Sequence, residues 1–246
     1  MLLQGDCLEE MKQLDDDSID LIFCDLPYGQ TSCAWDCKID LEAFWKEIMR
    51  IKKTNTPLFF TTTTKFGLDL LNSAPKKCPF RYDLVWMKSA PAGFLSAKKM
   101  PMRKHEMIYV FYEKLPFYDL SSHQHKFIKE VPVVKKEGGE YNHIYGNIKD
   151  MDYQHLKGKM GNPVYDPPLP TSMVEIKSTR GKHSTEKPVA LMEWILKYYS
   201  KEGDVVLDPT MGSGSTGVAC KNMNRNFIGI EMDPEIYEVA VGRVED

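Results

Sequence analysis

Residues 19–29, IDLIFCDLPYG, contain an unbroken apolar run that ends in a carboxylate, a proline, an aromatic ring and a glycine. Short runs of this kind are typical of a strand buried on both faces of a parallel sheet. Leu26 precedes Pro27 and is therefore kept out of the helical region, so the chain leaves the strand in an extended hook. The hook places Asp25 and Tyr28 at the carboxyl end of the sheet, where open α/β folds bind ligands. Acceptors beside a stacking ring suit a flat substrate with an amino group, such as adenine or cytosine; a plain strand followed by a turn is the alternative.

A second strand-end pattern lies near the other end of the sequence. Residues 212–217, GSGSTG, match G-x-G-x-x-G between an expected strand and an expected helix, and Glu231 ends the strand expected after that helix. Glycines let the backbone approach a nucleoside, and an acid at the end of the second strand can accept both ribose hydroxyls. The pattern therefore predicts a nucleoside site, with a plain turn as the alternative.

This glycine pattern is typical of an NAD-dependent oxidoreductase, but two features argue against that class. Asp208 ends the strand before the glycines, where it would repel a pyrophosphate but would favour a sulfonium or an amine. Only the short segment 218–246 follows Gly217, so the rest of the sheet must come from the amino-terminal strands. The chain is therefore circularly rearranged, and we expect the Asp25 strand to lie beside the Asp208 strand in one sheet.

Periodic segments alternate between strand and helix over most of the chain. We expect strands at 1–4, 21–24, 57–62, 82–86, 107–112, 205–208 and 226–231, and helices at 8–14, 41–52, 66–71, 189–199, 217–223 and 234–244. Residues 88–105 contain Pro91, Gly93 and Pro101 and are interpreted as a loop across the face of the sheet. The pattern dissolves at 113–182, which we interpret as a separate lobe or a large insertion.

The length of 246 residues fits one large α/β domain with an insertion, or two small domains, and a hydrophobic share of 42% is ordinary for a folded protein. No stretch approaches the roughly 20 apolar residues of a membrane span, and the amino terminus lacks the features of a signal peptide. We therefore expect an intracellular, cytoplasmic protein. Cys33 and Cys37 have no second pair, and His123 and His125 have no partners at a telling spacing, so we expect no metal site.

The net charge of −3 hides an uneven distribution. Residues 65–104 carry nine Lys or Arg against two Asp, whereas residues 183–246 carry six basic against eleven acidic residues. A basic face together with an acidic lobe suits a protein that holds a polyanion and a cationic small molecule. The candidate nucleic-acid-binding residues are Lys65, Lys88, Lys98, Lys99, Arg103 and Lys104.

Taken together, the motifs resemble those of the β-class of S-adenosylmethionine-dependent DNA amino-methyltransferases, in which the catalytic motif precedes the cofactor motif. Residues 25–28, DLPY, are similar to the catalytic motif D/N/S-P-P-Y, with Leu26 replacing the first proline. Residues 208–214, DPTMGSG, are similar to the cofactor loop, and GDC (5–7) and TEKP (185–188) to two further cofactor-side motifs, with Ser184 where a proline is common.

The resemblance covers about 1–112, the expected catalytic half, and 183–246, the expected cofactor-binding half. Residues 113–182 match no motif, as expected of a target-recognition region. The implied fold is Rossmann-like, with a mostly parallel seven-stranded sheet, helices on both faces and a permuted strand order.

The resemblance also implies an activity, the transfer of a methyl group from S-adenosylmethionine to N6 of an adenine flipped out of double-stranded DNA. In the family, Asp at the first motif position usually accompanies N6-adenine and Ser usually accompanies N4-cytosine, so N4-cytosine transfer is the alternative. A nucleic-acid-binding module that has lost transfer is another. A homodimer and a companion restriction endonuclease are compatible with the resemblance.

Site residues carry over from the family motifs. The implied catalytic residues are Asp25 and the Leu26 carbonyl, which accept the amine hydrogens, with Pro27 and the stacking ring of Tyr28. On the cofactor, Asp6 would accept from the adenine amine, Glu231 would bind the ribose, Asp208 would hold the amino-acid end and Lys187 would lie near its carboxylate. The implied cofactor-binding set is Asp6, Cys7, Asp25, Thr185, Lys187, Asp208, Pro209, Met211, Gly212, Gly214, Glu231 and Met232.

Overall fold

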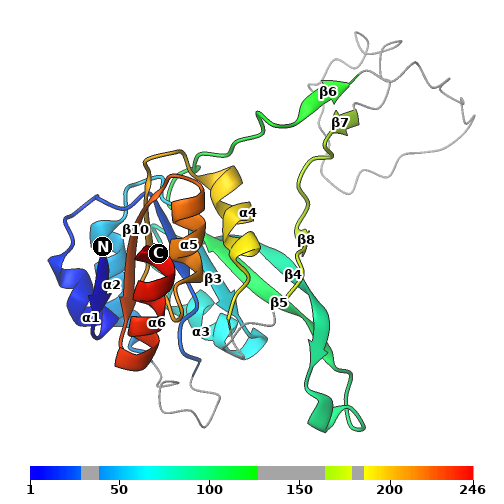
Figure 1. Ribbon diagram of the computed structural model, residues 1–246, viewed down its shortest axis with the longest axis horizontal. Helices are drawn as coiled ribbons and strands as arrows, with labels where there is room; N and C mark the ends of the chain where they lie inside the picture. The colour runs from blue at the N-terminus through cyan, green and yellow to red at the C-terminus, as the bar shows by residue number, and fades with distance from the viewer. Residues whose placement is uncertain (29–38, 127–163, 179–185, 246) are drawn as a thin grey trace, which may run out of the picture. The chain divides into compact units, whose positions relative to one another are not determined.

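The computed structural model describes residues 1–28, 39–126, 164–178 and 186–245 (Figure 1). Thr185, Cys33 and Cys37 lie outside the described residues. The chain divides into two compact units, one formed by Met1–Asp119 with Thr171–Asp246 and the other by Leu120–Pro170. In the smaller unit, β6 (Gln124–Lys126) pairs antiparallel with β7 (Val164–Asp166).

The larger unit is built, within the described residues, on an eight-stranded sheet in the order β1-β10-β9-β2-β3-β5-β4-β8. Its strands are β1 (Leu2–Gln4), β2 (Leu21–Cys24), β3 (Leu58–Thr62), β4 (Phe80–Ala92), β5 (Arg103–Phe111), β8 (Met173–Glu175), β9 (Val205–Asp208) and β10 (Asn226–Glu231). The first five strands in this order run parallel, β5 is antiparallel to both neighbours, and β4 and β8 are parallel. The expected α/β fold with a mostly parallel, permuted sheet is confirmed.

The permuted order follows from the pairing of β2 with β9 near the middle of the sheet, where Ile22 lies opposite Leu207. Every residue of β2 and of β3 is buried, which explains why both strands read as continuous apolar runs. The expectation that the Asp25 and Asp208 strands lie side by side is therefore confirmed.

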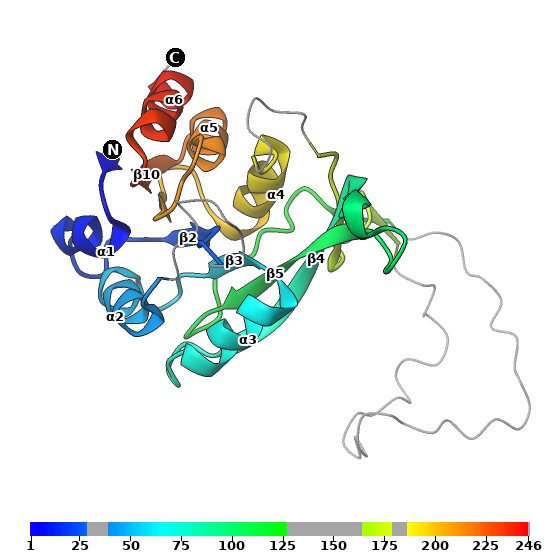
Figure 2. The same ribbon diagram turned by 90° about the horizontal axis from the view of Figure 1, so that it is seen from below.

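Helices cover both faces of this sheet (Figure 2). On one face lie α1 (Cys7–Glu10), which continues into a 3₁₀ turn at Met11–Gln13, α2 (Leu41–Ile51) and α3 (Thr64–Ser73). On the other lie α4 (Val189–Tyr199), α5 (Ser215–Asn222) and α6 (Pro234–Glu245). As an example of their packing, Asp40 caps the amino end of α2, and the helix buries Phe44 and Trp45 against Phe60 of β3. None of the described helices has the length and apolar character of a membrane span.

The prediction of a loop at 88–105 is wrong. β4 continues to Ala92 and β5 begins at Arg103, and these two residues pair, so the segment forms an antiparallel hairpin that projects beyond the helical layers (Figure 1). Pro91 lies on β4, where a register shift between Met87 and Ala92 interrupts the ladder. Gly93, with φ of 90°, then turns the chain into a short 3₁₀ segment, Phe94–Ser96.

The described sheet has eight strands, whereas seven were expected. The additional strand is β8, which lies within 113–182, a segment that the sequence indicated to be irregular. Val85 of β4 lies opposite Met173 of β8, and the Trp86 indole donates to the Ile176 carbonyl at 2.8 Å. A three-residue strand gives no periodic signal, so its sequence could not be told from the surrounding loop.

Candidate functional site

The site lies where the parallel strands end. Asp25 follows β2, Asp208 is the last residue of β9 and Glu231 the last residue of β10. Gly229 lies opposite Asp208 and Gln4 lies opposite Glu231, so Asp6 follows on the same edge of the sheet. Four carboxylates from both ends of the sequence are therefore brought to one edge.

Asp25 is held by three donors. Its Oδ1 accepts from the hydroxyls of Thr61 and Tyr28, the latter at 3.0 Å, and its Oδ2 accepts from Lys187 Nζ at 2.5 Å. Burial by itself raises the pKa of this carboxyl, but the Lys187 ammonium and the two hydroxyls together hold the pKa below its ordinary value. Asp25 is therefore ionised and fixed in orientation at neutral pH.

Lys187 has a second carboxylate partner, because its Nζ lies 3.2 Å from Glu106 Oε1. Its side chain is only 13% exposed. Burial alone lowers the pKa of this ammonium, but Asp25 and Glu106 raise it well above its ordinary range. The resemblance assigned Lys187 to the cofactor's carboxylate; in the structure its ammonium is bonded to two carboxylates of the protein.

The hook after β2 is anchored by Leu26, whose side chain is 2% exposed and belongs to the core cluster. Burial of this side chain fixes the hook where the family motif uses a proline ring. Pro27 and Tyr28 are half-buried, and the Tyr28 ring packs on Phe66 of α3 with centroids 5.1 Å apart. Burial, with Asp25 and Glu106 nearby, raises the pKa of Tyr28 far above its ordinary value, so the phenol stays neutral.

Asp208 is buried at the start of the glycine loop. Its carboxylate accepts from the Thr216 hydroxyl at 2.6 Å and from the Thr210 backbone N–H at 3.2 Å. Burial raises the pKa of Asp208 to about 7, aided by the charges of Asp25 and Glu231 and opposed by these two hydrogen bonds. A cationic ligand beside this group would lower that pKa and be held by it.

The loop between β9 and α5 depends on its glycines. Gly212 and Gly214 have φ of 53° and 82°, values that other residues adopt only with strain. A Cβ on Gly214 would also lie 3.3 Å from the Cα of Ala240 in α6, so the glycine permits the close approach of loop and helix. Arg243 of the same helix donates to the Ser213 carbonyl at 2.8 Å and pairs with Glu186 at 2.7 Å.

Glu231 caps this loop from β10. Its oxygens accept from the backbone N–H groups of Gly212 at 3.0 Å and of Asp233 at 2.9 Å, and burial raises its pKa. Asp6 caps α1 by accepting from the Leu8 N–H at 2.8 Å. Each of these carboxylate oxygens retains lone pairs that can accept from a ligand.

The remaining cofactor-side residues have different surroundings. Cys7 is buried, and this burial, with Asp6 nearby, raises the pKa of its thiol to about 12. Pro209 and Met211 are buried as well, and Met232 is half exposed.

These residues fit a cationic nucleoside such as S-adenosylmethionine. Among the described residues, Asp208 and Glu231 accept only neutral donors, so no cation of the protein offsets their charge. The Thr210 hydroxyl is buried and has no hydrogen-bond partner in the described part of the chain. A polar, positively charged ligand would supply both missing partners.

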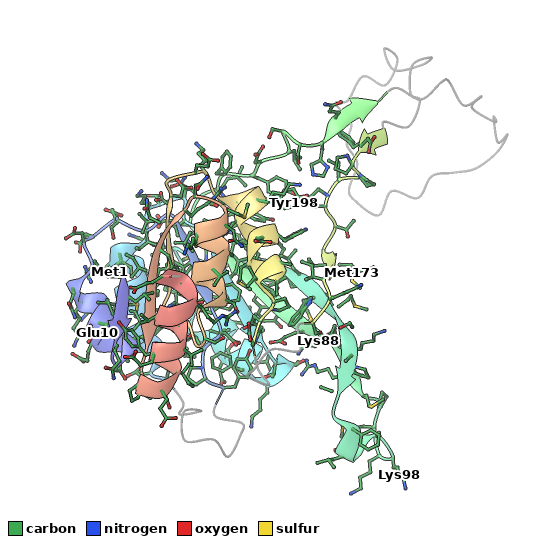
Figure 3. All side chains as sticks on the ribbon, viewed as in Figure 1. Met1, Glu10, Lys88, Lys98, Met173 and Tyr198 are labelled. Atoms are coloured by element: carbon green, nitrogen blue, oxygen red, sulfur yellow. The ribbon has the colours of Figure 1, made fainter. Side chains whose placement is uncertain are left out.

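The basic candidates lie mostly on the β4–β5 hairpin. Figure 3 shows Lys98 at its tip and Lys88 where the hairpin leaves the helical layers. Lys98, Lys99, Arg103 and Lys104 are exposed, as is Lys65 at the start of α3. Lys88 is only half-buried and pairs with Glu106 at 2.6 Å, so its charge is already shared within the protein.

Sequence reasoning missed two contributors to the site, Thr61 and Glu106. The hydroxyl-rich end of the expected strand at 57–62 was the available signal for Thr61. Glu106 gave no such signal, because it lies between the expected loop at 88–105 and the expected strand at 107–112, and its partner Lys187 lies in the other half of the sequence.

The fold is that of a Rossmann-like methyltransferase, with the Asp25–Tyr28 hook ahead of the glycine loop in the sequence. A model of the N6/N4 DNA methylase family matches residues 19–242. Among curated relatives, the type II methyltransferase M.HinfI of Haemophilus influenzae is 27% identical over 100% of this chain and 68% of its own length. The DNA adenine methyltransferase YhdJ of Escherichia coli K12 is 26% identical over 99% of this chain and 82% of its own length.

Solved structures show the same fold. The M1.HpyAVI–SAM complex superposes with a TM-score of 0.65 at 22% identity, covering 100% of this chain and 99% of that one. The cytosine-N4-specific PvuII DNA methyltransferase gives a TM-score of 0.68 at 15% identity, covering 100% and 86%. The chain belongs to the N6/N4 DNA methylase family and is a DNA methyltransferase dependent on S-adenosylmethionine.

Proposed function

We propose that this protein methylates the exocyclic N6 of adenine in double-stranded DNA. The observation that carries the proposal is the adjacency of two strand ends: the Asp25–Tyr28 hook follows β2, and the glycine loop follows its sheet neighbour β9. An amine bound at the hook and a methyl donor bound at the loop would therefore meet at one edge of the sheet.

Adenine is favoured over cytosine by two observations. The first motif position holds Asp25, the residue that usually accompanies N6-adenine in this family. One relative that aligns over nearly the whole chain is named a DNA adenine methyltransferase. N4-cytosine transfer is the second candidate, since a cytosine-N4-specific enzyme shares the fold and both bases present an exocyclic amine to the same acceptors.

The hook residues bind and orient the amine. Flipping the base out of the duplex costs a few kcal/mol, and stacking on Tyr28 would return about 1–3 kcal/mol. Asp25 and the Leu26 carbonyl would accept the two amine hydrogens, which localises the lone pair on nitrogen and fixes its direction. Positioning and these preorganised acceptors supply the acceleration.

Asp25 also receives the proton. S-adenosylmethionine, held by Asp208, Glu231 and the glycine loop, would supply an electrophilic methyl group on a sulfonium and would leave as the neutral thioether. The amine nitrogen that accepts the methyl group would become cationic. A carboxylate with a lowered pKa is too weak to deprotonate the neutral amine, but it accepts a proton readily from the cationic one. The products would be the neutral N-methylated base, the thioether form of the cofactor and protonated Asp25.

The surrounding residues are assigned to binding. Glu231, Asp6 and the 211–214 backbone would hold the ribose, the adenine and the amino-acid end of the cofactor, with Asp208 beside the cationic amino group. The exposed basic residues of the hairpin would hold DNA phosphates, and 113–182 would read the target sequence. Action on DNA suits a cytoplasmic enzyme. A homodimer and a companion restriction endonuclease stay predictions.

The test is methyl transfer by Asp25→Ala. We expect the variant to retain S-adenosylmethionine binding in calorimetry, because Asp208, Glu231 and the glycine loop are untouched, and to transfer no labelled methyl group to DNA. Asp40→Ala, which removes only the N-cap of α2, is the matched control and should transfer normally. Digestion of the methylated DNA should yield N6-methyladenine by mass. A fully active Asp25→Ala enzyme would contradict the proposed mechanism. Detection of N4-methylcytosine would establish the second candidate function. A wild-type protein that transfers no methyl group would be a nucleic-acid-binding module without activity.

A further inference from the structure

Four charged side chains form a continuous chain that ends at the proposed catalytic carboxylate. Lys88 on β4 pairs with Glu106 Oε2 at 2.6 Å, Glu106 Oε1 lies 3.2 Å from Lys187 Nζ, and that ammonium lies 2.5 Å from Asp25 Oδ2. The two central members are well shielded, since the side chains of Lys187 and Glu106 are 13% and 14% exposed. The chain thus connects the base of the β4–β5 hairpin to the end of β2.

This arrangement leaves a target amine one oxygen of Asp25 to bind. Oδ1 already accepts from two hydroxyls, whereas Oδ2 accepts from Lys187. A target amine would therefore bind at Oδ2 and compete there with Lys187, which belongs neither to the hook nor to β3. A shielded ammonium that loses its partner without replacement would oppose binding strongly. Glu106 is the carboxylate already in contact that can take it.

We propose that Glu106 is a positioning residue, which retains the Lys187 ammonium when the target amine displaces it from Asp25. In the free enzyme Lys187 keeps Asp25 ionised and oriented; in the substrate complex it moves fully to Glu106 and stays close enough to keep Asp25 charged. The inference rests on the proposed function, because it takes Asp25 as the acceptor of the amine. It assigns Glu106 a role that the motifs do not cover and gives Lys187 a partner on the protein.

The charges around the cluster set the expected direction of any pH effect. The other titratable or charged groups that face Asp25, Lys187 and Glu106 in the described residues are Tyr28, Lys88, Asp208 and Cys24. Tyr28 and Cys24 stay neutral because their pKa values are raised, and Lys88 is bonded to Glu106. Lys187 is therefore the cation that opposes the effect of burial on Asp25.

The first experiment uses the variant Glu106→Gln and measures base flipping and methyl transfer. With 2-aminopurine next to the target adenine, the fluorescence increase on enzyme binding should fall, because displaced Lys187 has no second carboxylate. The kcat/KM for DNA should fall about tenfold or more, in line with the cost of an unpaired shielded charge. Glu113→Gln is the matched control: it breaks the pair between Glu113 and the buried Lys52, 2.9 Å apart, and should change neither readout.

The second experiment uses Lys187→Gln and the pH profile of kcat. Without the ammonium, burial should raise the pKa of Asp25, so the acid limb should move to higher pH by about one unit or more. Titration calorimetry should show unchanged affinity for S-adenosylmethionine. A weakened affinity with an unmoved acid limb would overturn the inference and assign Lys187 to the cofactor. A Glu106→Gln enzyme with wild-type flipping and transfer would also overturn it, while Asp25 would keep its proposed role if Asp25→Ala is inactive.

Discussion

Asp25 and Asp208 are carboxylates at the ends of adjacent strands, yet the fold moves their pKa values in opposite directions. Burial raises the pKa of both. At Asp25 it is outweighed by Lys187 and two hydroxyls, whereas Asp208 has only Thr216 and a backbone N–H. The pair therefore combines an ionised acceptor with a carboxyl that gains from a cationic ligand, a division of roles that active sites often obtain from environment alone.

Replacing Asp208 by Asn should stabilise the ligand-free protein at pH 8 and have much less effect at pH 5. The pKa of Asp208 is about 7 in the folded protein, and about 3.9 is usual in unfolded chains. Between these values the folded state binds more protons than the unfolded state, so the free energy of unfolding falls as pH rises. Asn carries no charge, and the expected gain at pH 8 is on the order of 2–4 kcal/mol.

Urea denaturation of the variant and the wild type at both pH values measures this difference. Asp204→Asn, in the turn before β9, is the control for loss of a carboxylate next to the same strand. The Asp208→Asn protein should also bind S-adenosylmethionine more weakly, so stability and binding move in opposite directions. An equal stability difference at pH 5 and pH 8 would contradict the raised pKa.

At the scale of elements, local patterns predicted what local forces determine. Buried strands and amphipathic helices can be recognised by the spacing of their apolar residues. The bounds of β2, β9, α2 and α4 are therefore close to the expected ones. The hairpin was missed because Pro91 and Gly93 are ordinary loop signals, and because residues 89–92 of β4 and 103–105 of β5 are exposed on both faces and lack an apolar period. The Glu106–Lys187 contact was missed because a pair so distant in sequence depends on strand order, which no local pattern carries.

Besides its positive charge, the hairpin tip carries two apolar side chains that are exposed to solvent. Phe94 is 81% exposed and Leu95 is 100% exposed, next to Lys98 and Lys99. DNA-binding proteins use such apolar wedges to unstack base steps while basic residues hold the phosphates. We expect Phe94→Ser with Leu95→Ser to weaken duplex binding about tenfold without lowering stability.

Fluorescence anisotropy over a range of salt concentrations separates the two contributions. Lys98→Ala with Lys99→Ala should reduce the slope of log affinity against log salt by roughly 2, whereas the Phe94 and Leu95 changes should leave the slope unchanged. Leu115→Ser, at a leucine that is 80% exposed outside the hairpin, is the matched control. Equal binding by the wild type and the Phe94 and Leu95 variant would show that the tip does not contact DNA.

At the scale of the whole molecule, the sheet contains strands from both ends of the chain, paired with one another. Strand β2 from the amino-terminal half pairs with β9 from the carboxyl-terminal half, and β1 pairs with β10. Neither half contains a complete parallel sheet, so both must be present for either to bury its strands. The stretch Leu120–Pro170 forms its own unit, and none of its described residues belongs to this sheet.

Replacing 120–170 by a flexible linker of about ten Gly and Ser residues should therefore leave the larger unit folded. We expect cooperative thermal unfolding by circular dichroism and normal affinity for S-adenosylmethionine in calorimetry, because β9, β10 and the glycine loop are untouched. Sequence-specific methylation of plasmid DNA should disappear, since the deletion removes most of the segment 113–182 that is proposed to read the target.

A fragment ending at residue 119 provides the contrast for this deletion. It retains β2 and β3 but exposes the edge of β2 that β9 covers, so it should not unfold cooperatively. If the linker variant keeps the wild-type methylation pattern, target reading belongs to the larger unit, and the hairpin becomes the segment to examine for it. If the linker variant fails to fold while the fragment folds, the sheet does not depend on strands from both ends of the chain.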